Sequence, residues 1–257
     1  MRLTHALVRP PSRSFAEGLT GADLGSPNTA LARAQHDRYC EELARCGLRL
    51  TRLPVDEHHP DGTFVEDTAI LTGRGAILAR PGAPSRLGEV ESVREALMER
   101  VPSLGEIAAP GTLDGGDVCD AGDRFLIGIS ARTNAEGARQ LAATLGGHGY
   151  QATVLDVREI PGLLHLKSGL AALGDGRLVA IEALARRPEL RAYDTVRVRE
   201  AEGYGANCVR VNDRLLIARG FPVLEAALVK LGYDVVTLEM SEFRKMDGGL
   251  TCLSLRF

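Results

Sequence analysis

Apolar residues recur at spacings of three, four and seven along four stretches of the chain, and this spacing predicts amphipathic helices. The first stretch runs from about Thr29 to Cys46, the second ends at Pro102, the third begins after Asn134, and the last opens with Pro222. The positions expected to face inward are Leu31, Tyr39, Leu43 and Cys46 in the first helix, Val90, Val93, Leu97 and Val101 in the second, Ala138, Leu141 and Leu145 in the third, and Leu224, Leu228 and Leu231 in the last.

A short phrase follows three of these helical patterns: a glycine, a residue that favours strands, and then alternation that ends in leucine. It occurs at Gly47–Leu53, Gly149–Leu155 and Gly232–Leu238. A glycine directly after an amphipathic helix is typical of a helix end, and the alternation behind it predicts a strand. Each helix is therefore expected to lead into a strand.

Pairs of short apolar strands precede the helices. The predicted pairs are Thr68–Leu71 with Ala76–Ala79, Val118 with Phe125–Ile127, Leu170–Leu173 with Leu178–Ile181, and Val209–Val211 with Leu215–Ala218. The connections between them, Gly73–Gly75, Gly122–Asp123, Gly174–Gly176 and Asn212–Asp213, are short and rich in Gly, Asp and Asn, which is typical of hairpins. The repeating unit is strand, strand, helix, strand, and it occurs about four times between Asp61 and Met240.

The two ends of the chain supply a fifth unit. Thr4–Arg9 predicts a strand followed by the first helix, and Leu250–Phe257 predicts a lone terminal strand that joins it. Such units hide their sheet edges when they close radially, as in propellers. We therefore expect an α/β fold, a five-bladed propeller around a pseudo-fivefold axis, formed as a single domain over residues 1–257. The competing layout is a doubly wound Rossmann sheet, but it needs single strands alternating with helices and a glycine-rich phosphate loop, and no GxGxxG or GxxxxGK[ST] motif is present.

Composition narrows the class of protein. With 44% hydrophobic and 25% charged residues, the 257-residue chain is ordinary for a globular protein and unlike a disordered chain, a collagen or a coiled coil. The formal net charge of −3 gives no basic surface for nucleic acid. No apolar run approaches the roughly 18 residues of a membrane span, and Met1–Pro11 lacks the apolar stretch of a signal peptide.

The five cysteines are an odd number without CxxC spacing. They are Cys40, Cys46, Cys119, Cys208 and Cys252. This pattern favours a reducing compartment and argues against a disulfide framework or a zinc site. We therefore expect a cytoplasmic protein that binds no metal.

Residues that can carry chemistry stand just before the first strand of each unit. In chain order they are Glu66-Asp67, Asp114 with Asp117, His165 with Lys167, Asn207-Cys208 and Thr251-Cys252. If the units surround an axis, the starts of these strands converge at one end of a central channel. Carboxylates, an imidazole and a thiol would then meet, and a cysteine with a distant histidine is a typical nucleophile and acid/base pair.

Several of these residues also have a simpler interpretation. Cys252 could be a small buried hydrophobic residue. However, the turn Met246–Gly249 directly before it is a typical place for an accessible reactive group. His165 lies between leucines, so a structural histidine is an alternative, and Asp114 could be a turn former. The other four cysteines look packed, while the histidines expected at the surface are His36, His58, His59 and His148.

The acid pair Glu66-Asp67 is less easily explained as two solvent-exposed surface residues. It stands between Phe64-Val65 and an apolar strand, where carboxylates would be poorly hydrated. Buried carboxylates require paired donors, so a converging acidic cluster suits a cationic ligand such as a guanidinium group.

Six segments at these positions together resemble a known family. FVED (64–67), TLDGGD (112–117), ARTNAEGARQ (131–140), LLHLKSG (163–169), ANC (206–208) and MDGGLTC (246–252) occur in this order. They are similar to the dimethylarginine dimethylaminohydrolases of the guanidino-group modifying, or pentein, superfamily, and the match covers in effect the whole chain. The resemblance implies a five-bladed α/β propeller. It also implies hydrolysis of Nω-methylated L-arginine, a small-molecule substrate, to L-citrulline and methylamine or dimethylamine through a covalent Cys thiouronium intermediate, with no cofactor.

The resemblance also implies roles for individual residues. The nucleophile matches Cys252, the general acid/base matches His165, and the carboxylate that orients this histidine matches Asp114. The positions implied to bind substrate are Glu66, Asp67 and Asp247 at the guanidinium, Asp61 near the amino-acid end, Arg86 and Arg132 at the α-carboxylate, and Leu19 and Met246 through their backbones. Leu19 belongs to a lid-like loop, Glu17–Gly21.

Two other functions stay open. One is a related guanidine hydrolase such as an arginine deiminase, although these carry an added helical segment for which 257 residues leave no room. The other is a non-catalytic binder of arginine-like ligands, against which the intact Cys252, His165 and Asp114 argue. The preferred substrate and the oligomeric state are also open, and an exposed blade edge is one way to form a homodimer.

Overall fold

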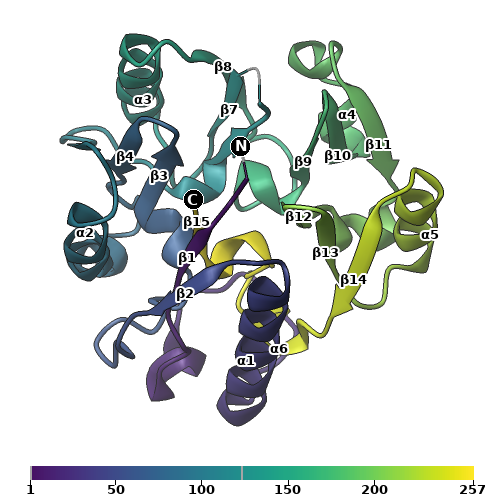
Figure 1. Cartoon of the computed structure of the whole chain (residues 1–257), viewed down its shortest axis with the longest axis horizontal. Coiled ribbons are helices and arrows are strands. Elements are labelled where there is room, and N and C mark those ends of the chain that lie inside the picture. Colours follow the sequence, from purple (N-terminus) through teal and green to yellow (C-terminus); the bar gives the residue numbers. More distant parts are fainter. Residues whose placement is uncertain (1, 123) are drawn as a thin grey trace.

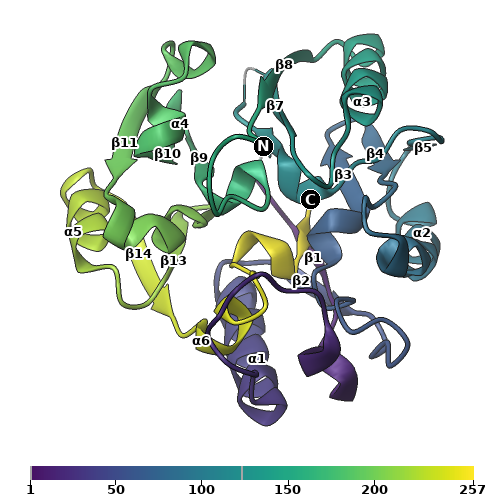
Figure 2. The same ribbon diagram turned by 180° about the vertical axis from the view of Figure 1, so that it is seen from behind.

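The computed structural model describes residues 2–122 and 124–257. In this part of the chain, five three-stranded sheets surround a central axis, and the helices lie on the outside of the ring (Figure 1). Figure 2 shows the same ring from behind. In each sheet the first two strands pair antiparallel and the third pairs parallel with the second. The five-bladed α/β propeller is confirmed, and the doubly wound alternative is wrong.

The sheets follow one another along the chain, except that the first contains both ends. Their strands are β15 (Leu255–Arg256), β1 (His5–Val8) and β2 (Arg49–Arg52); β3 (Ala69–Thr72), β4 (Gly75–Leu78) and β5 (Leu104–Glu106); β6 (Val118–Asp120), β7 (Arg124–Ile129) and β8 (Gln151–Asp156); β9 (Leu170–Gly174), β10 (Arg177–Ile181) and β11 (Asp194–Val198); and β12 (Val209–Val211), β13 (Arg214–Ala218) and β14 (Asp234–Leu238).

A helix connects the second strand of each sheet to the third. These helices are α1 (Thr29–Arg45), α2 (Val90–Met98), α3 (Ala135–Gly147), α4 (Glu182–Ala185) and α5 (Pro222–Lys230), and a further helix, α6 (Ser241–Arg244), precedes the last turn. A 3₁₀ turn precedes the first strand of each sheet: η2 (Val65–Thr68), η4 (Gly115–Asp117), η5 (Leu166–Ser168), η7 (Glu200–Ala206) and η8 (Thr251–Leu253). The remaining 3₁₀ turns are η1 (Arg13–Glu17), η3 (Pro84–Glu89) and η6 (Pro188–Leu190).

The local signals in the sequence explain these elements. Asn28 caps α1 and Asn134 caps α3, each accepting a backbone N–H with its side chain, which satisfies a donor that a helix start leaves free. Gly47, Gly149 and Gly232 have φ of +91°, +82° and +88°. Glycine reaches this left-handed conformation without steric cost, so the three predicted helix ends are confirmed.

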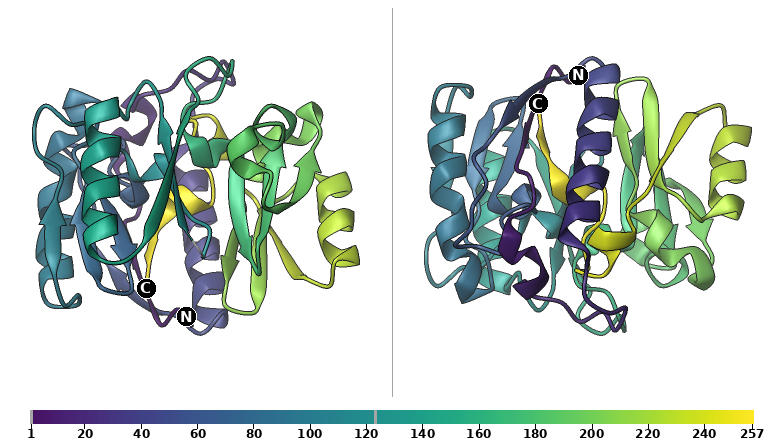
Figure 3. Two further views of the ribbon diagram at one scale, coloured as in Figure 1. Left: turned by 90° about the horizontal axis from the view of Figure 1, so that it is seen from above. Right: turned by 90° about the horizontal axis from the view of Figure 1, so that it is seen from below.

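The ends of the chain close the ring. Ala6 pairs with Arg256 between antiparallel strands, while β1 pairs parallel with β2. The buried hydroxyl of Tyr39 on α1 lies 2.6 Å from that of Ser254 and fixes the last segment from outside. Figure 3 shows that both termini lie at the same end of the ring.

Two predictions about the first helix are wrong. Leu31 is 45% exposed, and His36, which we expected at the surface, is fully buried. The buried face of α1 contains the polar Gln35, whose amide bonds the Ser241 hydroxyl and the Glu242 backbone N–H on α6. Tyr39, Leu43 and Cys46 are buried as predicted, but counting apolar positions missed the polar residues of this face and wrongly included Leu31.

The predicted terminal strand Leu250–Phe257 is also too long. Only Leu255–Arg256 forms a strand, because residues 251–253 form the turn η8. There the Thr251 N–H bonds the side chain of Asn207 instead of a neighbouring strand. Of the predicted hairpin turn Gly122–Asp123, Asp123 lies outside the described residues. In the described ranges no helix is both long and apolar enough to cross a membrane.

We expect Leu43→Ala on α1 to lower the free energy of unfolding by roughly 2–5 kcal/mol, because the side chain is fully buried and leaves a cavity. Leu31→Ala on the same helix is the matched control and should change it by about 0.5 kcal/mol or less. Chemical denaturation followed by circular dichroism measures both values. Equal losses for the two variants would contradict the buried face assigned to α1.

Candidate active site

The five 3₁₀ turns bring together residues that are far apart in sequence. The turns η2, η4, η5, η7 and η8 contact one another around the axis. The predicted convergence of strand starts is therefore confirmed. A small pocket at this point is lined by Leu19, Asp61, Phe64, Asp67, Arg86, Arg132, Leu164, His165, Met246, Asp247, Gly248 and Cys252. Of the predicted site residues, Glu66 and Asp114 do not line it.

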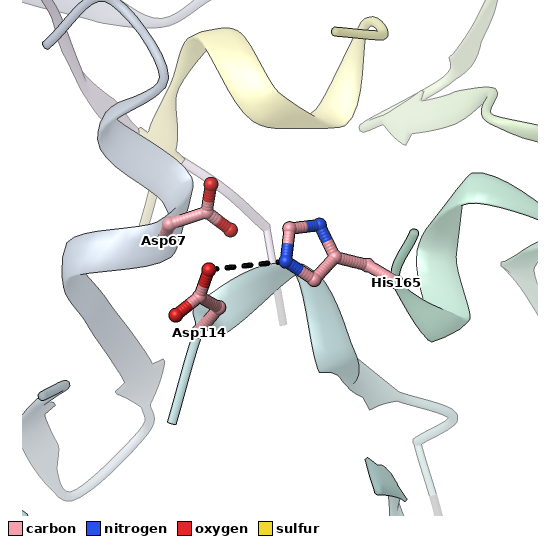
Figure 4. A group of neighbouring side chains, drawn as sticks. All are labelled: Asp67, Asp114 and His165. Atoms are coloured by element: carbon pink, nitrogen blue, oxygen red, sulfur yellow. Dashed lines mark hydrogen bonds and ion pairs between the residues drawn. The ribbon is translucent and has the colours of Figure 1, made fainter. Parts of the chain in front are cut away.

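Asp114 lies directly behind His165. Its Oδ2 is 3.1 Å from the imidazole Nε2 (Figure 4), and its Oδ1 accepts the Gly82 N–H at 2.8 Å. The carboxylate is fully buried, and its own backbone N–H bonds the Thr133 hydroxyl. A carboxylate held at both oxygens in this way can fix the orientation of the imidazole, which is the role predicted for Asp114.

The charges around His165 favour its protonated form. Burial by itself disfavours an imidazolium, but Asp67, Asp117 and the hydrogen-bonded Asp114 outweigh it and raise the pKa of His165 to about 9. At neutral pH the side chain is therefore a proton donor.

Asp117 is a residue that the sequence analysis placed near the site without giving it a role. Its Oδ1 accepts the Leu166 N–H at 2.9 Å and its Oδ2 accepts the Ser130 hydroxyl at 2.6 Å, so it ties η4 to the turn that follows His165. Burial raises its pKa. In the sequence, Asp117 could have been noticed as the second acid of the segment TLDGGD. The preceding residue must be a glycine for steric reasons, because a Cβ on Gly116 would lie 2.8 Å from His165 Nδ1.

Cys252 lies in the middle of η8 and is the one partly exposed cysteine among the described residues. Removal from bulk water, followed by the charges of Glu66 and Asp67, raises the pKa of its thiol to about 12, against the opposing effect of the Gly249 N–H that points at Sγ from 3.4 Å. At neutral pH the sulfur is thus a neutral thiol. The other four cysteines are buried, as predicted.

The neighbouring acids Glu66 and Asp67 point to different sides. Asp67 faces the pocket, where Arg86 Nη1 lies 2.7 Å from its Oδ2. Burial opposes its ionisation, but Arg86 and His165 lower the pKa of Asp67 to about 2. A 3₁₀ turn has three residues per turn, so adjacent side chains diverge by about 120°.

Glu66 instead lines a cavity of about 590 Å³ on the other side of the turns. Its carboxylate is held by Lys167 Nζ at 2.6 Å, the Thr251 hydroxyl at 2.7 Å and Arg256 Nη2 at 3.5 Å. The structure does not bring it to the pocket with Asp67. The expectation that both acids face the substrate therefore has geometric support for Asp67 alone.

The two arginines expected at the α-carboxylate differ in their surroundings. The guanidinium of Arg86 is buried and bonded to Asp67 and, in a bidentate arrangement, to Glu89. Arg132 is partly exposed at the pocket, and its guanidinium has no hydrogen bond or ion pair within residues 2–122 and 124–257. Arg132 is thus available to an anionic group, whereas Arg86 chiefly holds Asp67 in place.

Two carboxylates of the pocket hold the lid-like loop. Both Asp61 oxygens lie 3.1 Å from the Leu19 N–H, and Asp247 Oδ2 accepts the Gly21 N–H at 2.6 Å. Burial raises the pKa of Asp61. The pocket encloses about 20 Å³, space for about one water molecule. This space is too small for an amino-acid ligand unless the loop or the side chains that line the pocket move.

Met246, buried beside the lid, places its side chain against Gly18. In the described part of the chain no N–H donates to the carbonyls of Leu19 or Met246. Both predicted backbone contacts therefore remain available as acceptors.

Asp67, Asp114 and His165 offer ligand atoms within 4.8 Å of one another, as a metal site would (Figure 4). Their surroundings do not suit a metal ion. The Arg86 guanidinium already balances Asp67, and a metal would require His165 to lose the proton that three acids favour. The absence of a metal cofactor stays a prediction.

Known proteins resemble this chain along its full length. A dimethylarginine dimethylaminohydrolase from Pseudomonas aeruginosa is 44% identical over 98% of this chain and 99% of the relative, and one from Streptomyces coelicolor is 37% identical over 98% and 96%. The arginine deiminase family model matches residues 57–183.

Solved structures of the same enzyme family also match this chain. A cysteine-to-serine variant of the Pseudomonas aeruginosa enzyme, complexed with citrulline, matches all of both chains with a TM-score of 0.97 and 43% identity. A histidine-to-glycine variant of a dimethylarginine dimethylaminohydrolase, in an adduct with S-methyl-L-thiocitrulline, matches 99% of this chain and 100% of its own with a TM-score of 0.96 and 43% identity. The N-terminal domain of ArgZ, a cyanobacterial arginine dihydrolase, shares the fold with a TM-score of 0.87 at 19% identity.

The charge on His165 predicts a pH dependence. Its folded pKa of about 9 lies above the ordinary 6.5, so it stabilises the folded protein fully below about pH 6.5, and this stabilisation is lost as pH rises through 9. We expect imidazole NMR signals of His165 to titrate well above pH 7, and at lower pH in Asp114→Asn, which removes one acid. A wild-type midpoint near 6.5 would contradict the assigned electrostatics.

Proposed function

This chain belongs to the dimethylarginine dimethylaminohydrolase family, and on that premise we infer that it hydrolyses Nω-methylated L-arginine to L-citrulline and methylamine or dimethylamine. The protein is a hydrolase of C–N bonds with a small-molecule substrate. The observation that carries the function is the meeting of Cys252, His165 and Asp67, from three separate turns, in one closed pocket.

The first step of the proposed mechanism is attack by sulfur. A guanidinium carbon is a weak electrophile because resonance spreads its charge, so a thiolate is a suitable nucleophile. Asp67, ionised and fixed by Arg86, would hold the guanidinium against Cys252. A cation beside the sulfur offsets the two acids that oppose its ionisation, so the thiol releases its proton to solvent water when substrate binds.

His165 would serve both halves of the reaction. As an imidazolium it donates its proton to the departing amine while the C–N bond breaks, which leaves a thiouronium on Cys252. The now neutral imidazole removes a proton from water, which attacks the same carbon. Collapse of that adduct breaks the C–S bond, the hydroxyl proton passes to solvent, and citrulline and the thiolate are released. Asp114 keeps the ring oriented and supports its charged form in both steps.

The amino-acid end of the substrate would bind near the lid-like loop. Arg132 is suited to the α-carboxylate, since a guanidinium binds it with two parallel hydrogen bonds. Asp61 and the carbonyls of Leu19 and Met246 suit the α-ammonium group. Asp247, which holds Gly21, would contact the guanidinium and close the loop over it.

A second candidate is the deimination of unmethylated arginine. The match of residues 57–183 to the arginine deiminase model favours it to the extent that the two reactions share a propeller. They differ only in the amine that leaves, so a direct comparison of substrates separates them.

We also propose that residues 1–257 form one catalytic unit and that it works in the cytoplasm. The free state of the five cysteines supports a reducing compartment. Ring closure by both ends of the chain supports a single unit.

We expect the wild type to release citrulline from asymmetric dimethyl- or monomethylarginine faster than from arginine. Cys252→Ser should abolish turnover and keep detectable methylarginine binding by calorimetry, because the pocket remains while the nucleophile is lost. Mass spectrometry of rapidly quenched wild-type protein should find the thiouronium adduct on the peptide containing Cys252. Normal citrulline formation by the serine variant would eliminate the covalent mechanism, and release from arginine alone would favour the deiminase.

We expect Arg132→Ala to raise KM for methylarginine about 10- to 100-fold with little change in kcat, because one charge-assisted contact to the α-carboxylate is lost. Arg139→Ala, at an exposed position paired with Glu136 on α3, is the matched control and should change neither constant. Steady-state kinetics give both values. An unchanged KM for Arg132→Ala would reassign this residue to a structural role.

A further inference from the structure

A buried amide joins the two turns that carry the proposed chemistry. Asn207 directly follows η7 and is 5% exposed. Its Nδ2 donates to the Lys167 carbonyl at 3.0 Å and to the Thr251 hydroxyl at 3.2 Å, and its Oδ1 accepts the Thr251 N–H at 3.0 Å. Lys167 lies in η5, two residues after His165, while Thr251 directly precedes Cys252. One side chain thus bonds the acid/base turn and the nucleophile turn at once.

The nucleophile turn packs directly onto this amide. A Cβ added to Gly249 would lie 2.5 Å from Asn207 Cγ, so only glycine allows the approach. The N–H of the same Gly249 points at Cys252 Sγ from 3.4 Å. A shift of the Asn207 amide would therefore be transmitted to the sulfur through both Thr251 and Gly249.

A side chain within η7 also bonds the segment that leads to Cys252. The Tyr204 hydroxyl donates to the Gly248 carbonyl at 2.8 Å. The Arg244 guanidinium lies over the Tyr204 ring, 5.0 Å from its centroid, which keeps this ring in place. The segment 204–207 thus bonds the turn 248–251 at both ends, but only Asn207 also reaches η5.

We propose that Asn207 is a positioning residue that fixes the separation between Cys252 and His165. This rests on the proposed function, in which the sulfur attacks and the imidazole protonates the same substrate. A misplacement of about 1 Å at reacting groups costs on the order of 100-fold in rate. The groups assigned to the amino-acid end, Arg132 and Asp61, make no hydrogen bond to Asn207 within the described residues, so substrate affinity is set independently.

The test compares Asn207→Ala with Asn212→Gly. Asn212 is a matched control, because its side chain also makes three hydrogen bonds, to Leu3 N–H and to the Leu3 and Cys46 carbonyls, in a hairpin turn with φ of +54° that glycine adopts without strain. We expect Asn207→Ala to lower kcat for monomethylarginine about 10- to 100-fold with KM within about 3-fold. Asn212→Gly should lower the melting temperature and keep kcat.

Asn207→Asp keeps the shape of the side chain and covers the case in which the alanine variant fails to fold. Its carboxylate still accepts the Thr251 N–H, but it cannot donate to Lys167. It also adds a negative charge near a thiol whose pKa burial, Glu66 and Asp67 already raise. We expect the same loss of kcat and a shift to higher pH in the alkylation of Cys252 by iodoacetamide, read by mass spectrometry.

The outcomes separate this proposal from the proposed function. Wild-type kcat in folded Asn207→Ala and Asn207→Asp, equal kcat losses in Asn207→Ala and Asn212→Gly, or a change in KM alone would overturn the positioning role. A wild-type protein that releases no citrulline from any methylarginine would instead overturn the function. The alkylation profile of Asn207→Asp is read without turnover, and an unshifted profile would overturn the placement of this side chain beside the nucleophile turn and with it the positioning role.

Discussion

Pairing of β1 with β15 is the interaction on which the site depends. The last strand has only two residues, Leu255–Arg256, yet its pairing holds η8 against η2 at the axis. The contact is seen in the hydrogen bond from the Thr251 hydroxyl to Glu66, which joins residues 185 positions apart. Without this closure Cys252 would stand on a free chain end, and the other four turns would surround an incomplete ring.

Closure also forces charges out of water, and the arrangement of the site follows from pairing them. Asp67 is balanced by Arg86, which Glu89 orients from the other side. Glu66 is balanced by Lys167 and Arg256. An ionised group in such surroundings is costly unless it is paired and hydrogen-bonded. Burial and the charges of Glu66 and Asp67 raise the pKa of the Cys252 thiol to about 12 against a smaller opposing effect of Lys167, so the thiol is neutral. In the proposed mechanism a cationic substrate supplies the charge that favours the thiolate.

Two other acids of the pocket hold the lid. Asp61 and Asp247 accept backbone N–H groups of the loop at Leu19 and Gly21, and these contacts close the pocket to about the size of one water molecule. A substrate with cationic groups at both ends would bind where the loop now binds. Loop opening and substrate entry are therefore linked through two carboxylates.

The sequence by itself determined the local elements and the repeating unit. Helical spacing, caps at Asn28 and Asn134 and the glycines after the helices act within a few residues, so they can be read without knowing what packs against them. The family segments further pointed to Cys252, His165, Asp114 and Asp67, which the fold does bring together.

Only the tertiary structure decided the direction in which particular side chains point and what they bond. His36 is fully buried on a partly polar face of α1, which no count of apolar residues reveals. Glu66 and Asp67 are neighbours in sequence but diverge on a 3₁₀ turn, and Arg86 is occupied by Glu89 and Asp67. Asn207 shows the same limit, because its proposed role depends on bonds to two turns that are distant in sequence and meet only in the closed ring. Spacing along a chain fixes which residues share a face, whereas the partners of that face come from elsewhere in the fold.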